Sequence, residues 1–238
     1  MNTLSGKAFI LPDRKGVPMP SDTRNDLEQF IQHLEKNNKE SAIDFALSLL
    51  ENETLSVPEL YEAVLAPSLN RIEVPREKED SLIWREHLMS YIVRTVMEAA
   101  YPYVLKERKK AGKTMKDKLV VLACPEEEYH EIGIRMGADF FTILGYQVAF
   151  IGSNTPRDTL LNAVQELKPD IVSISITNFL NLAQLPATVM ALKALQPGLQ
   201  VYLSGSALKH AGKDAADFKA DGVLNTFASI QALGEGKK

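Results

Sequence analysis

The sequence predicts an α/β protein, in which an N-terminal bundle of four helices precedes a domain with a five-stranded parallel sheet. Two observations support this prediction. Up to about residue 111, apolar residues recur at helical spacing with almost no strand signal. Beyond it, short runs rich in valine and isoleucine alternate with helical patterns. Such alternation is typical of βαβ units, whose strands are parallel.

The first part is predicted to be an extended leader at residues 1–22 followed by a helical domain at residues 23–112. The leader contains three prolines and little periodicity. Pro102 lies within the last helical pattern and is a candidate for ending or kinking that helix. The four helical patterns cover residues 27–34, 42–50, 57–69 and 81–106. Their short connections favour an antiparallel bundle.

The second part, residues 117–238, is predicted to be a flavodoxin-like or Rossmann-like domain. The expected strands cover residues 119–123, 147–151, 171–176, 200–203 and, more weakly, 222–224. Helical patterns cover residues 131–144, 156–167, 182–195 and 229–233. The strands are almost continuously apolar because both faces of a parallel sheet are covered.

Small and polar residues lie at or just after the expected carboxyl ends of four strands. In an open parallel sheet, ligands bind at the edge that these carboxyl ends form. The loop after the first strand carries Glu128, Tyr129 and His130, and Ile132 and Gly133 begin the next helix. Because imidazole is a common metal ligand, His130 is a candidate ligand and Glu128 its candidate partner. The other candidate site residues are Gly152, Asn154, Ser173, Ser175, Thr177, Ser204, Gly205 and Ser206.

Composition argues against several classes of protein. The net charge is −4, and the locally basic stretch at 106–118 is interpreted as a linker rather than a nucleic-acid contact. Cys124 is the single cysteine, which excludes an intrachain disulfide and a cysteine-cluster metal site. Because the chain has neither a signal peptide nor an apolar run of membrane length, we expect a cytoplasmic protein with no membrane segment.

Three separated blocks resemble the signature of the cobalamin-binding domain of methionine synthase, the mutases and the corrinoid methyl carriers. That signature is Asp-x-His-x-x-Gly, roughly 41 residues, Ser-x-Leu, roughly 27 residues and Gly-Gly. This chain has Glu128-x-His130-x-x-Gly133, then 41 residues, Ser175-x-Thr177, 27 residues and Gly205-Ser206. Three identities depart from the signature: glutamate replaces aspartate, threonine replaces leucine and serine replaces the second glycine.

The resemblance implies that cobalamin binds with its own base displaced from cobalt and with His130 as the lower ligand. Imidazole suits a cobalt centre, and Glu128 would accept a hydrogen bond from the other ring nitrogen, either directly or through water. The nucleotide tail would enter a crevice at the sheet edge past the glycines of the signature. Ser175 and Thr177 would donate hydrogen bonds to it.

Trp84, Glu86 and His87 lie on the fourth expected helix, which the resemblance identifies as part of a cap over the corrin. On a plain amphipathic helix, Trp84 and Leu88 would pack into the bundle. The Glu-His pair is also similar to the cap of light-sensing, adenosylcobalamin-dependent transcription regulators. That likeness implies that His87 is an upper cobalt ligand, and it favours adenosylcobalamin over methylcobalamin. Arg76 stands where those regulators have a tryptophan.

Two functions remain open at this point. One is a non-enzymatic cobalamin sensor, in which light or a changed upper ligand alters packing or oligomeric state. Its output would pass by contact with a regulator or signalling enzyme, because the leader is too short for the regulators' DNA-binding domain. The other is a corrinoid methyl carrier, which would serve a methyltransferase without catalytic residues of its own. A homo-oligomer fits either function, whereas His130 disfavours loss of the cofactor or its replacement by haem.

Overall fold

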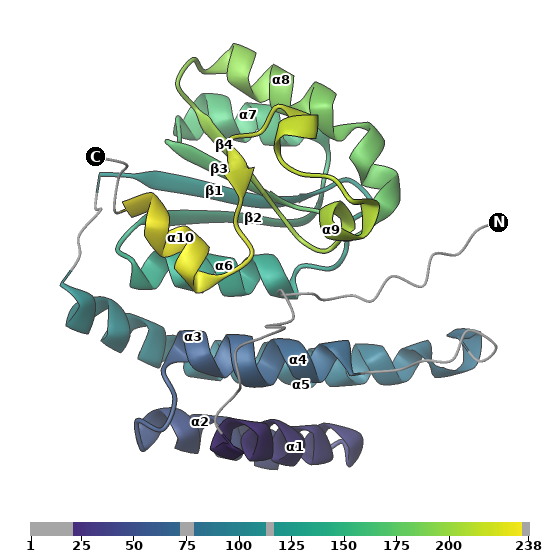
Figure 1. Ribbon diagram of the computed structural model, residues 1–238, viewed down its shortest axis with the longest axis vertical. Coiled ribbons are helices and arrows are strands. Elements are labelled where there is room, and N and C mark those ends of the chain that lie inside the picture. Colours follow the sequence, from purple (N-terminus) through teal and green to yellow (C-terminus); the bar gives the residue numbers. More distant parts are fainter. Residues whose placement is uncertain (1–20, 72–78, 113–116, 235–238) are drawn as a thin grey trace. The chain divides into compact units, whose positions relative to one another are not determined.

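The computed structural model describes residues 21–71, 79–112 and 117–234. The described residues form two compact units, one helical up to Glu107 and one α/β from Arg108 onward (Figure 1). The expected leader lies outside the described residues except for Ser21 and Asp22, which begin the first helix. No described helix is both long enough and apolar enough to cross a membrane.

The helical unit contains four helical segments among its described residues. They are α1 (Ser21–Glu35), α2 (Lys39–Glu51), the composite segment α3 (Val57–Leu60), η1 (Tyr61–Leu65) and α4 (Ala66–Asn70), and α5 (Glu79–Ala111). The composite segment begins with a capping box, in which the Ser56 hydroxyl accepts from the Glu59 amide and the Glu59 carboxylate accepts from the Ser56 amide. Its middle turn, η1, is a π-helix.

Prolines affect two of these helices differently. The wide π turn ends at Leu65, two residues before Pro67. Pro67 has no amide to donate, and its ring crowds the carbonyl one turn earlier. Pro102, in contrast, lies inside α5 without ending it. Ala100 and Val104, on either side of Pro102, are completely buried. Packing on both sides therefore holds the helix in place across the missing hydrogen bond.

The α/β unit confirms the predicted five-stranded parallel sheet. Its strands, β1 (Leu119–Pro125), β2 (Gln147–Thr155), β3 (Ile171–Ser175), β4 (Gln200–Ser204) and β5 (Gly222–Val223), lie in the order β2-β1-β3-β4-β5. This is the flavodoxin-like order, in which β2 lies on one side of β1 and the later strands lie on the other. The order in which strands are added therefore switches between β1 and β3, while all strands stay parallel. Strands β1 and β2 run two and four residues further than predicted, ending at 125 and 155 rather than at 123 and 151.

Helices cover both faces of the sheet. Figure 1 shows α6 (Ile132–Ile143) and α10 (Phe227–Gly234) on one face, and α7 (Arg157–Leu167) and α8 (Leu185–Leu195) on the other. Three short segments were not predicted: η3 (Phe179–Ala183), α9 (Ala207–Ala211) and η4 (Ala216–Phe218). With three to five residues each, they are too short to show a helical period in the sequence.

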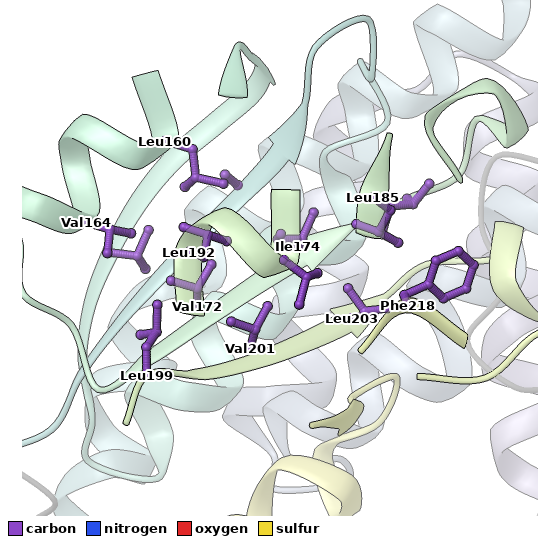
Figure 2. Packing of buried hydrophobic residues seen from close by; sticks show 14 of the residues in the cluster. Leu160, Val164, Val172, Ile174, Leu185, Leu192, Leu199, Val201, Leu203 and Phe218 are labelled. Atoms are coloured by element: carbon purple, nitrogen blue, oxygen red, sulfur yellow. The ribbon is translucent and has the colours of Figure 1, made fainter. Parts of the chain in front are cut away.

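Apolar residues and serines alternate along β3, and the buried cluster beneath α7 and α8 explains this pattern (Figure 2). Val172 and Ile174 belong to this cluster and pack with residues of α7, α8 and β4. Because side chains alternate along a strand, Ser173 and Ser175 point to the opposite face. Both serines are buried, with exposures of 3% and 4%. This places them on the α6–α10 side of the sheet.

Candidate functional site

The loop between β1 and α6 brings Glu128 and His130 into direct contact. Oε1 of Glu128 lies 2.6 Å from Nδ1 of His130. The Glu128 side chain is completely buried, whereas 41% of the His130 side chain is exposed. The hydrogen bond expected from the sequence is therefore direct in this structure, and the imidazole remains accessible at the sheet edge.

Glu128 also connects this loop to the segment that follows β3. Its Oε2 accepts hydrogen bonds from the backbone amides of Thr177, at 2.7 Å, and Asn178, at 2.6 Å. Its Oε1 additionally accepts from the His130 amide at 3.2 Å. One carboxylate thus holds two loops that lie about fifty residues apart in the chain. The sequence placed Asn178 at the end of the polar stretch after the third strand, but its amide as a partner of Glu128 is a finding of the structure.

The environment of Glu128 keeps it ionised. Burial raises the pKa of its carboxyl group, but the hydrogen bonds from His130, Asn178 and Thr177 together lower that pKa by more. An ionised carboxylate only accepts hydrogen bonds, so Nδ1 of His130 must carry the proton. Nε2 is then the ring nitrogen that would coordinate a metal.

The Glu128–His130 pair offers one candidate metal ligand, Nε2 of His130. Among the described residues, no three or more His, Cys, Asp or Glu side chains are grouped so that they could hold an ion. Cys124 lies near His130, but burial and the charges of Glu128 and Glu131 raise the pKa of its thiol, which stays neutral. One imidazole backed by a carboxylate is a typical axial ligand for a metal in a macrocycle.

Asn154, a predicted cofactor contact at the end of β2, interacts with the β1–α6 loop. Its amide donates to the Glu128 carbonyl at 2.9 Å, and its Oδ1 accepts from the Glu127 amide at 2.9 Å. Gly152, two residues earlier, has a φ of +109° and lies at an irregularity in the pairing of β1 with β2. Both residues therefore shape the edge strand beside the loop.

Gly205 is required by the packing of the chain itself. Its φ is +95°, and a Cβ at this position would lie 2.2 Å from the carbonyl oxygen of Ile176. Its amide donates to Oδ1 of Asn225 at 3.0 Å, a partner that the sequence did not single out. The close approach of the loops after β3 and β4 accounts for this glycine without any ligand.

The remaining predicted residues of the α/β unit lie around the same edge. Thr177 and Ser206 are buried, with exposures of 6% and 3%, and Ser204 ends β4. Ile132 is the first residue of α6, with Gly133 directly after it. Tyr129 is 66% exposed between Glu128 and His130. The edge therefore combines an exposed aromatic ring and imidazole with buried hydroxyl groups.

A cavity of about 740 Å³ opens at this edge, on the face covered by α7 and α8. Leu160, Ile174 and Leu185 line it, together with Glu126 and Glu127 of the β1–α6 loop. None of the predicted site residues contributes to its lining. This cavity is therefore different from the crevice expected on the Ser173–Ser175 side of the sheet.

The candidate residues of the helical unit lie on α5. Trp84 is 56% exposed, so the alternative in which it packs into the bundle is wrong. Nε2 of His87 lies 3.7 Å from Oε2 of Glu86, and Glu86 also accepts from the Ser90 hydroxyl at 3.0 Å. Arg76 falls outside the described residues.

Comparison with known proteins identifies the α/β unit. Residues 118–229 match the B12 binding domain family. This segment is similar to B12 binding domains, and the match covers slightly less than half of the chain. The match contains the Glu128–His130 pair and all five strands of the sheet, so cobalamin is the cofactor that the comparison supports.

Two curated relatives come from Myxococcus xanthus. The HTH-type transcriptional repressor CarH is 31% identical over 150 residues, which are 63% of this chain and 48% of CarH. The HTH-type transcriptional repressor CarA is 30% identical over 91 residues, which are 38% of this chain and 29% of CarA. The matched part is therefore less than half the length of either repressor.

A solved structure extends the likeness in fold beyond the B12 binding domain. The Methanosarcina barkeri monomethylamine corrinoid protein has a TM-score of 0.73, with 89% of this chain and 98% of that protein covered. Sequence identity is 12%, so the likeness concerns the fold alone. It includes a large part of the helical unit, because the B12 binding domain itself spans only residues 118–229.

Proposed function

We propose that this chain is a cobalamin-binding regulatory protein in which His130 is the lower cobalt ligand. The observation that carries the proposal is the 2.6 Å contact between Nδ1 of His130 and the buried carboxylate of Glu128. This contact orients the ring, selects the tautomer and increases the basicity of Nε2. Cobalamin, when bound, supplies a cobalt centre whose upper ligand can be exchanged.

The residues around this pair have complementary roles in the proposal. The amides of Thr177 and Asn178 hold the Glu128 carboxylate, so the imidazole is oriented before the cofactor arrives. Ser173 and Ser175 lie on the α6–α10 side of the sheet, where they would line the crevice for the nucleotide tail. The exposed rings of Tyr129 and Trp84 would offer apolar surface to the corrin from their respective units.

Sequence similarity supports a sensor rather than a carrier. The two curated relatives are both transcriptional repressors, and the CarH match extends over 63% of this chain. Glu86 and His87 supply a second carboxylate–imidazole pair, on the exposed part of α5. In the proposal, His87 binds cobalt from the upper side, the bound form is adenosylcobalamin, and a regulator or signalling enzyme receives the output.

A test of the sensor is to load the protein with adenosylcobalamin in the dark and to illuminate it. Absorption spectra and gel-filtration volumes before and after light report ligation and assembly. We expect both to change, and His87→Ala should alter only the spectrum of the illuminated state. An identical spectrum and elution volume after illumination would contradict the sensor.

The second candidate is a corrinoid methyl carrier, which the fold of the Methanosarcina barkeri protein favours. Here the Glu128–His130 pair would have the same role, and a partner methyltransferase would supply the catalytic residues. Incubating the reduced, cobalamin-loaded protein with a methylamine and its methyltransferase distinguishes the two functions. Accumulation of methylcobalamin on the protein would support the carrier, whereas its absence together with a light response would support the sensor.

A further inference from the structure

The turn that presents Glu128 and His130 has an unfavourable backbone conformation. The Glu128 amide donates to the Pro125 carbonyl at 3.1 Å, which closes a turn over residues 125–128. Within it, Glu127 has a φ of +59°. Left-handed backbone costs free energy for a residue with a side chain, so other contacts must hold this turn.

Asn154 provides these contacts from the neighbouring strand. Its Oδ1 accepts from the Glu127 amide and its own amide donates to the Glu128 carbonyl, both at 2.9 Å. The Glu127 amide and the Glu128 carbonyl flank the peptide group that joins these two residues. The two hydrogen bonds therefore hold that peptide group at both ends. Asn154 itself has a φ of +50°, a conformation that asparagine adopts more readily than most residues.

We propose that Asn154 is a positioning residue, which fixes the Glu127–Glu128 turn and thereby directs the Glu128 carboxylate toward His130. This replaces the direct cofactor contact expected from its sequence position. The proposal rests on the proposed function for the role of His130. The turn, however, is held by the chain's own hydrogen bonds and can be measured without cofactor.

Three variants separate the side-chain acceptor from the backbone conformation. Asn154→Gly keeps access to positive φ but removes Oδ1, whereas Asn154→Asp keeps an acceptor at the same place. Asn37→Gly is the matched control, because Asn37 has a φ of +51° and is exposed after α1 in the helical unit.

The first measurement is amide hydrogen exchange in the cofactor-free protein, followed at Glu127, Glu128, Thr177 and Asn178. We expect Asn154→Gly to accelerate exchange at these amides by about fivefold, the factor that one net hydrogen bond contributes. Asn154→Asp should restore slow exchange, and Asn37→Gly should leave it unchanged. Wild-type exchange rates in Asn154→Gly would overturn the proposal.

The second measurement is electron paramagnetic resonance of protein loaded with hydroxocobalamin and reduced to the Co(II) form. With ¹⁵N-labelled histidine, coordination by histidine appears as an altered nitrogen coupling. We expect this signature in the wild type and Asn154→Asp, and a reduced fraction in Asn154→Gly. An equal fraction in wild type and Asn154→Gly would overturn the role of Asn154 at the ligand. A wild type without the signature would instead refute His130 as lower ligand, whereas the exchange data would still decide whether Asn154 holds the turn.

Discussion

Oε2 of Glu128 lies 2.6 Å from the backbone amide of Asn178, fifty residues further along the chain. The same side chain reaches Nδ1 of His130 through its other oxygen. Aspartate, the residue in the related signature, is one methylene shorter. The longer acid therefore lets one buried carboxylate hold both the imidazole and the backbone that follows β3.

Replacing His130 by alanine tests the lower ligand. With cobalamin bound, His130→Ala should lose the absorption spectrum of nitrogen-ligated cobalt, because the residue that would supply Nε2 is gone. His210→Ala is a matched control, since His210 is also exposed in the α/β unit and follows β4 on α9. An unchanged spectrum in His130→Ala would show that another group binds cobalt.

Shortening Glu128 to aspartate tests its double role. Glu128→Asp keeps the charge but cannot span both loops, so we expect His130 to stay oriented while the amides of Thr177 and Asn178 lose their acceptor. An unsatisfied buried group costs roughly 1–3 kcal/mol. The free energy of unfolding of the cofactor-free protein, measured in urea, should fall by this amount. Equal stability of Glu128→Asp and wild type would argue against the connection to β3.

Acid should remove the contribution of Glu128 to stability. Its pKa in the folded protein lies below the ordinary value of 4.5, because hydrogen bonds outweigh the effect of burial. A carboxyl group with a lower pKa in the folded protein stabilises the folded state at pH values above its pKa in the unfolded chain. This stabilisation is lost as the pH falls through the pKa of the folded protein. The difference in unfolding free energy between wild type and Glu128→Gln should therefore shrink as the pH falls below about 4.5. A difference that persists unchanged in acid would contradict the lowered pKa.

Gly205→Ala should destabilise the α/β unit more than a typical glycine substitution. The added Cβ would lie 2.2 Å from Ile176 O, whereas nothing lies within 4 Å of a Cβ at Gly198. Because their φ angles are +95° and +93°, Gly198→Ala controls for backbone strain alone. We expect Gly205→Ala to lose about 1–3 kcal/mol more than Gly198→Ala in chemical denaturation, the usual cost of overpacking. Equal losses would mean that the loops after β3 and β4 separate easily.

Much of the architecture follows from local patterns. Strand-length apolar runs separated by helical periods predict a parallel sheet. Ser175 lies at the end of one such run, and Glu128 and Gly205 follow two others, so all three are placed at one edge. The ends of β1 and β2 were predicted too early, because Cys124, Pro125 and the residues after Ile151 lack the apolar pattern of a strand. Their pairing with each other, rather than their composition, extends these strands.

The sequence by itself determined the fold class, the cobalamin signature and the pairing of a carboxylate with His130, because each depends on residue type and spacing along the chain. Only the tertiary structure decided which backbone groups complete the site. The strand order places β1 between β2 and β3, so that Asn154 reaches the Glu127–Glu128 turn from one side and Asn178 reaches Glu128 from the other. Such contacts join residues about 27 and 50 positions apart, and no local pattern encodes them.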